Sequence, residues 1–285
     1  MTEKPRLIRF SAAVTYRFAA ALLIVFALGP SAIFGQFTGE RLADLYPPDD
    51  PNSGYHDKLS TLSGMVNVAR ATVRQTVGES VTIPDPQSIK MFRIHGRTHI
   101  EAYGFYFTNC PGSISINERL ICGRPAGPNN GVPNKALGPK TIMHESMHCQ
   151  LLEAREPLPE APGGAEGPPS TDQKIVDLKT AFTSYCYDIE HVHIYRRTRA
   201  LEWWLARIAG LSGAEAEASA ELSKNSEEGA RRRAAQSLQR LCDCLDDAFM
   251  QYGADNAWLR FVERKKNSKR RSVRFGDFVG GASHV

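Results

Sequence analysis

Residues 141–150 read TIMHESMHCQ and contain the pattern H-E-x-x-H at positions 144 to 148. In a helix, His144 and His148 lie one turn apart on the same face, so two imidazole nitrogens can reach one Zn²⁺ ion. Glu145 is rotated by about 100° around the helix axis, which places its carboxylate beside such an ion. We therefore expect a metal-binding helix from about residue 140 to residue 155.

Glu145 is the candidate catalytic residue of this helix. Zinc lowers the pKa of a bound water toward 7, and a carboxylate beside the metal can accept a proton from that water. The same carboxylate can then pass the proton to the amine that leaves when a peptide bond is cleaved. The motif thus predicts hydrolysis of a peptide or protein substrate, with Zn²⁺ as the cofactor.

The motif resembles that of the zincin metallopeptidases. The segment 113–117, SISIN, is similar to the zincin edge strand, which pairs with an extended substrate through main-chain hydrogen bonds. A helical apolar pattern over 61–77 fits the minimal layout of the family, and the resemblance spans about residues 61–209. It implies a zincin-like α+β fold: a small mixed sheet with an edge strand packed on the motif helix, followed by a long ligand-bearing helix and further C-terminal helices.

A catalytic zinc site needs a third protein ligand, which the motif itself does not supply. The extended metzincin pattern requires Gly at position 151 and His at position 154, where this chain has Leu151 and Ala154. The gluzincin alternative is a glutamate on a later helix. The long helix predicted over 171–209 offers such a residue within the polar run 185–195, YCYDIEHVHIY.

Glu190 is the preferred third ligand because of its place in that run. It shares a helix face with Cys186, and a Cys186 that faces Cys149 would bring Glu190 close to the neighbouring His148.

Other residues of the run remain alternatives. His191, His193 and Asp188 could each complete the site, since zinc accepts nitrogen and oxygen donors. His191, His193 or Tyr195 could also donate a hydrogen bond to the tetrahedral oxyanion.

Strand-like segments precede the motif, and helices follow it. The strand-like segments are 81–84, 90–95, 99–108 and 114–117. After loops at 123–140 and 156–170, amphipathic patterns predict helices over 171–209 and 213–251. Because strands and helices are segregated along the chain, the order predicts α+β rather than alternating α/β.

The composition is that of a folded globular protein. The 285 residues are 42% hydrophobic and 23% charged, which excludes a wholly disordered chain and a polytopic membrane protein. The net charge of +4 is unevenly spread, because residues 264–274 carry +7 and residues 1–35 carry +3. This excludes a uniformly basic nucleic-acid binder, and we expect no nucleic acid partner. We expect the tail 263–285 to be disordered and solvated, with contact to anionic lipid or nucleic acid as the alternative.

The N-terminal segment indicates export. Residues 18–35 are strongly apolar and follow several basic residues, which is typical of a signal peptide or a single-pass membrane anchor. A buried core helix is the alternative. We expect a periplasmic, secreted or membrane-anchored protein.

Export would permit disulfides. The candidate pairs are Cys110 with Cys122 and Cys149 with Cys186, whereas Cys242 and Cys244 diverge on a predicted helix.

These patterns divide the chain into a signal peptide or anchor (1–35), a linker (36–60), a zincin-like metallopeptidase domain (61–210), a helical extension (211–262) and a basic tail (263–285). They predict a zinc metallopeptidase in which His144, His148 and Glu190 hold the metal and Glu145 is general base and acid. The alternative is a non-catalytic exported or membrane-anchored binding or scaffold protein with a degenerate zincin-like site.

Overall fold

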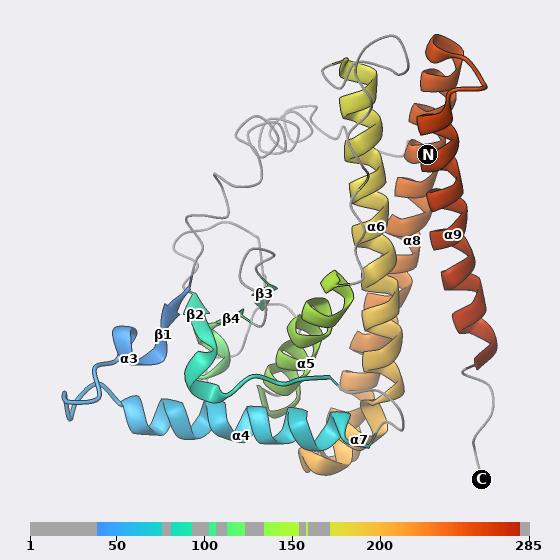
Figure 1. Cartoon of the computed structure of the whole chain (residues 1–285). Helices are drawn as coiled ribbons and strands as arrows, with labels where there is room; N and C mark the ends of the chain where they lie inside the picture. The colour runs from blue at the N-terminus through green and yellow to red at the C-terminus, as the bar shows by residue number, and fades with distance from the viewer. Residues whose placement is uncertain are drawn as a thin grey trace, which may run out of the picture.

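The chain folds as a mostly helical α+β structure with two parts, a body that contains the sheet and a bundle of long helices (Figure 1). The computed structural model describes residues 39–75, 81–92, 103–106, 113–122, 134–153, 158 and 172–279. The predicted leader or anchor at 1–35 lies outside these ranges. Among the helices that they contain, none is both long and apolar enough to cross a membrane.

A small mixed sheet forms one layer of the body. Its strands are β1 (Glu40–Arg41), β2 (Lys90–Phe92), β3 (Gly104–Tyr106) and β4 (Ile114–Asn117), in the order β1-β2-β4-β3. β2 and β4 are parallel, with Met91 opposite Ile116, and the other pairs are antiparallel. The strand predicted at 114–117 is confirmed, whereas 81–84 forms no strand.

The position of β4 corrects the prediction that 113–117 is the edge strand. β4 lies between β2 and β3, and β3 is the last described strand beside it. All four residues of β4 are buried, Ser115 included, so both faces of this strand are covered.

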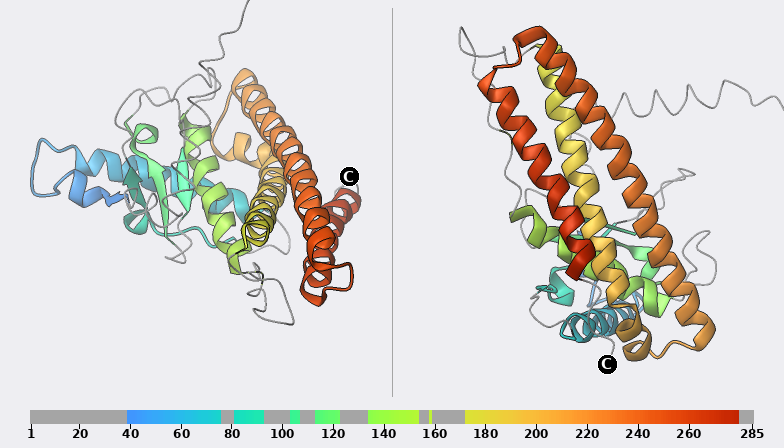
Figure 2. Two further views of the ribbon diagram at one scale, coloured as in Figure 1. Left: turned by 90° about the horizontal axis from the view of Figure 1, so that it is seen from above. Right: turned by 90° about the vertical axis from the view of Figure 1, so that its right-hand side faces the viewer.

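Two helices pack with the sheet. α4 (Tyr55–Val73) confirms the helix predicted at 61–77 but begins earlier, and α5 (Asn134–Glu153) carries the H-E-x-x-H motif. α5 lies between the sheet and the bundle (Figures 1 and 2). It crosses α4 where Gly138 faces Met65, because a Cβ at position 138 would overlap the methionine side chain. Short segments complete the body: α3 (Leu42–Leu45) and the 3₁₀ turns η1 (Pro86–Ser88) and η2 (Glu118–Leu120).

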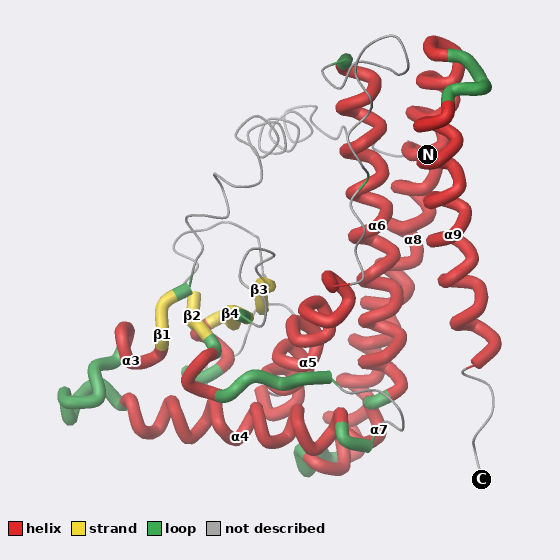
Figure 3. The backbone as a smooth tube through the Cα atoms, viewed as in Figure 1, coloured by secondary structure: helices red, strands yellow, loops and turns green. Residues whose placement is uncertain are grey.

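The bundle is formed by α6 (Gln173–Ala200), α8 (Gly213–Tyr252) and α9 (Ala257–Val279), which run side by side in all views (Figures 1 and 2). The helix predicted at 171–209 is divided at Leu201 into α6 and the short α7 (Glu202–Ile208). α8 begins at a capping box in which Ser212 and Glu215 satisfy each other's backbone amides. Figure 3 shows the strands gathered on the side of the body away from α9.

The helix α9 includes residues 263–279 of the segment that was predicted to be a disordered tail, and residues 280–285 lie outside the described part of the chain. The first turns of α9 bury Trp258, Leu259 and Val262 in the bundle. The helix then continues through the basic segment to Val279, since Lys and Arg are good helix formers once a helix has started.

Two apolar cores correspond to the two parts. One joins the sheet, α4 and α5 to Ile194 of α6 and to Leu201 and Leu205. The other is confined to the bundle. α6 therefore contributes to both cores from opposite faces.

The described residues contain no disulfide. Cys242 and Cys244 are separate thiols on α8, as expected. Cys110 and the side chain of Cys149, the partners predicted for Cys122 and Cys186, lie outside the described part of the chain, so both pairings stay predictions.

Candidate metal centre

The motif helix places its two histidines as the spacing predicts. The Nε2 atoms of His144 and His148 on α5 are 3.1 Å apart, and their ring centroids are separated by 4.8 Å. Both side chains point toward α6 and not toward the sheet, because each ring also lies against the ring of His191. The prediction that the two residues share a helix face is confirmed.

His191 on α6 joins these two residues in a three-histidine cluster. One ligand atom from each ring lies within 4.8 Å of the others, so the described residues contain a group that could hold a metal ion. Tetrahedral zinc with Zn–N bonds of 2.0–2.1 Å would require nitrogens about 3.3 Å apart. The 3.1 Å between the Nε2 atoms of His144 and His148 is close to this value, and the ligand atom of His191 lies within 4.8 Å of both.

Hydrogen bonds hold the Nδ1 atoms of two of the three rings. The Nδ1 atom of His191 is 2.9 Å from the main-chain oxygen of Tyr187, which can only accept, so Nδ1 carries the proton. In the same way, Nδ1 of His148 donates to Oε1 of Glu190 at 2.6 Å. A neutral imidazole that donates from Nδ1 presents an unprotonated Nε2.

Burial favours the neutral form of two rings of the cluster, His144 and His191. It lowers the pKa of His144 well below the ordinary value, and the neighbouring His148 and His191 lower it further. Burial and the proximity of His148 also lower the pKa of His191 to about 4. These two rings are therefore neutral imidazoles near neutral pH, which is the form in which histidine binds a metal.

Glu190 lies behind His148 and not within the cluster. Its carboxylate binds the ring nitrogen that faces away from His144, and both partners are buried. This geometry differs from the prediction that Glu190 is the third ligand. That prediction required Cys186 to face α5, whereas Cys186 packs against the bundle core on the other side of α6.

The remaining alternatives are also placed elsewhere. Asp188 forms an ion pair with Arg233 of α8 at 3.8 Å. Burial lowers the pKa of His193, and Arg196, Arg197 and Lys269 lower it further, which places this ring toward α9. Neither residue is part of the three-histidine cluster.

A sequence signal for His191 exists in the apolar stripe of α6. Residues 175, 178, 182, 185, 189 and 192 are apolar or aromatic, and all are buried in the bundle core. At 100° per residue, His191 lies about 150° from the centre of this stripe, whereas Glu190 lies about 110° and His193 about 50° from it. The histidine is therefore the ligand candidate that most nearly faces away from the bundle.

Glu145 is buried beside the cluster, with 7% of its surface exposed. Burial raises the pKa of its carboxyl group to about 8. The strand β3 passes close to it: a Cβ on Gly104 would be 2.6 Å from Cγ and 2.7 Å from Oε1 of Glu145. A side chain at position 104 would therefore force Glu145 or Thr141 to move, and nothing in the sequence pattern singles out this glycine.

Two tyrosines of α6 flank the histidines. The ring centroid of Tyr195 is 4.9 Å from that of His144 and 5.8 Å from that of His191. The ring centroids of Tyr187 and His191 are 4.3 Å apart. Because Tyr187 is 52% exposed, it forms an outer wall of the site. Burial raises the pKa of Tyr195, and Glu145 raises it further against the opposite effect of Arg233, so this hydroxyl stays protonated near neutral pH.

No family description, curated protein or solved structure matches this chain significantly. The structure thus establishes a buried cluster of three histidines on two helices that could hold a metal ion.

Proposed function

We propose that the protein is a zinc-dependent hydrolase that cleaves peptide bonds, with His144, His148 and His191 as the protein ligands. The observation that carries this proposal is the convergence of three imidazoles from two helices with a buried carboxylate, Glu145, which directly follows His144 in the sequence. Three nitrogen ligands and one open position are typical of catalytic rather than structural zinc.

Glu145 acts as the proton acceptor and donor. Bound zinc supplies Lewis acidity and lowers the pKa of a coordinated water toward 7. A dication at the histidines favours the carboxylate form of Glu145, whose pKa burial alone raises to about 8. As a carboxylate it accepts a proton, and it then donates this proton to the leaving amine.

Two neighbouring residues on α6 orient a metal ligand and the substrate. Glu190 fixes the tautomer and the ring plane of His148 through the 2.6 Å hydrogen bond. The protonated hydroxyl of Tyr195, which lies on the same side of α6 as His191, is the candidate donor to the oxyanion.

The strand β3 is the site at which an extended substrate would pair. It is the last described strand on its side of the sheet, and its Gly104 lies against Glu145. A peptide added beside β3 would bind through main-chain hydrogen bonds close to the catalytic carboxylate. This strand takes the role that the sequence assigned to 113–117.

The cellular location remains a proposal from the sequence. The apolar segment 18–35 supports export across the cytoplasmic membrane, with the protein periplasmic, secreted or held by an anchor.

Elemental analysis and a peptide-cleavage assay on the full chain test the proposal together. We expect one zinc per chain in the wild type and in Glu145→Gln, with cleavage of an unbiased peptide mixture only in the wild type. Cleavage by Glu145→Gln at the wild-type rate would refute the role of this residue. Absence of zinc after zinc was supplied during folding would favour the scaffold alternative.

A further inference from the structure

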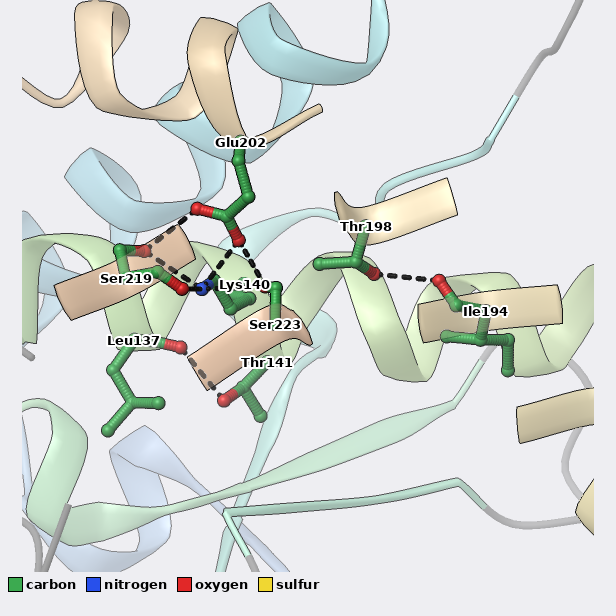
Figure 4. A network of polar contacts seen from close by, with 8 residues as sticks. All are labelled: Leu137, Lys140, Thr141, Ile194, Thr198, Glu202, Ser219 and Ser223. Carbon is green, nitrogen blue, oxygen red and sulfur yellow. Dashed lines mark hydrogen bonds and ion pairs between the residues drawn. The ribbon is translucent and has the colours of Figure 1, made fainter. Parts of the chain in front are cut away.

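A buried polar network joins α5 to α7 and α8 (Figure 4). The ammonium group of Lys140 on α5 lies 2.6 Å from Oε1 of Glu202 on α7. It also donates to Oγ of Ser219 at 2.8 Å and to Oγ of Ser223 at 3.0 Å, both on α8. Each serine hydroxyl in turn donates to the carboxylate of Glu202. We call these four residues the Lys140 network.

The network specifies geometry more than it adds stability. All four side chains are buried, and burial lowers the pKa of Lys140 because the charged form is desolvated. A buried ion pair of this kind is often no more stabilising than apolar residues of the same volume. Its hydrogen bonds are directional, however, and the three N–H groups of Lys140 have acceptors on two other helices. Rotation of α5 about its axis would break them.

The network and the metal ligands lie on the same face of α5. Lys140, His144 and His148 follow one another at intervals of four residues, so Lys140 is one helical turn from His144, the first proposed ligand. The third histidine comes from α6, which packs along α8. The relative orientation of α5 and the α6–α8 pair therefore decides whether the three imidazoles converge. A rotation of α5 by even a fraction of the 100° between residues would separate them.

We propose that the Lys140 network is a positioning device for the metal centre, with Lys140 and Glu202 as positioning residues that hold the orientation of α5 for metal binding. This inference rests on the proposed metal-binding function.

Two other charged groups provide matched controls. Lys135, also on α5, pairs with Glu215 of α8 at 2.8 Å, but both side chains are substantially exposed. Glu227 of α8 is buried and pairs with Arg199 and Arg231, at 3.1 Å and 2.7 Å, without involving α5. The first control tests whether any lysine link on α5 matters, and the second tests whether loss of any buried charge network matters.

The experiment measures zinc affinity by competition with a chromophoric chelator and the visible absorption of the Co²⁺-loaded full chain. For Lys140→Met we expect about tenfold weaker zinc binding, as for the loss of outer-sphere partners of metal ligands, and an altered cobalt spectrum. Lys135→Met and Glu227→Gln should keep the wild-type affinity within about twofold and the wild-type spectrum, because neither pair fixes the face of α5 that carries the histidines.

Two milder variants cover the case in which Lys140→Met fails to fold. Ser223→Ala removes one hydroxyl of the network, and the double variant Lys140→Met/Glu202→Leu replaces the ion pair by an apolar pair without an unpaired charge. We expect the double variant to recover stability while its cobalt spectrum stays altered. A wild-type spectrum and affinity in both variants would overturn the positioning role. Failure of the wild type itself to bind zinc would instead overturn the metal-binding function on which this role rests.

Discussion

The variant Glu190→Gln tests whether Glu190 binds the metal directly or only orients the ligand His148. The hydrogen bond from His148 to Glu190 is 2.6 Å long and buried, and bonds to charged groups contribute about 1.5–3 kcal/mol. Glutamine keeps the shape and an accepting oxygen but removes the negative charge. Only the part of the bond that depends on the charge is lost, so zinc affinity should fall about tenfold to a hundredfold, the range for outer-sphere partners.

The free energy of unfolding of the metal-free protein should rise or stay the same in Glu190→Gln. A buried carboxylate is costly to desolvate, and a neutral amide in the same place avoids that cost. We therefore expect Glu190→Gln to lower zinc affinity without lowering the free energy of unfolding of the metal-free chain. Removal of a direct ligand in His191→Ala should weaken zinc binding more than Glu190→Gln does.

Chelator competition on both variants, with urea unfolding of the metal-free proteins, gives the comparison. Complete loss of zinc in Glu190→Gln together with retained zinc in His191→Ala would refute this reasoning and return the role of third ligand to Glu190.

Further predictions follow from Gly104, from His191 and from the metal itself. Gly104→Ala should lower peptide cleavage at least tenfold with zinc retained, because the new methyl group displaces Glu145; Gly64→Ala, which meets no atom within 4 Å, should leave both unchanged. Cleavage at the wild-type rate in Gly104→Ala would contradict the close approach of β3. In the metal-free protein, the pKa of His191 is lowered to about 4, so between about pH 6.5 and pH 4 the unfolded chain binds a proton that the folded chain does not. The free energy of unfolding should therefore fall by about 3 kcal/mol as the pH drops through this window. His191→Ala should make the free energy of unfolding less dependent on pH. The same pH dependence in both proteins, measured by urea unfolding at several pH values, would contradict this prediction. Zinc at a thousand times its Kd should stabilise the fold by about 4 kcal/mol, and a chelator should reverse this gain. Because Glu145 is not a proposed ligand, zinc should stabilise Glu145→Gln by the same amount in thermal unfolding.

Local patterns predicted the elements better than their arrangement. The motif helix, α4 and α8 could be recognised because apolar periodicity and motif spacing are local properties of the chain. The order of strands depends on contacts between distant segments, so the alternation in 113–117 indicated a strand but not its interior position. The basic segment after residue 263 has little apolar pattern of its own, and its helix depends on the anchoring turn at Trp258 and Leu259.

The site shows the same limit more sharply, because adjacent residues on α6 have different roles. Glu190 and His191 are both buried, both able to bind zinc and 100° apart around the helix, so the identity of the third ligand is a question of helix rotation alone. That rotation is set by the bundle: Tyr185, Ile189 and Val192 must face α8 and α9 to bury their surface. Once they do, His191 turns toward α5, and Glu190 can reach only the far side of His148. Motif spacing treats the two residues as equivalent, whereas the apolar stripe distinguishes them. The packing of a core that contains no candidate ligand therefore decides which side chain would complete the proposed metal centre.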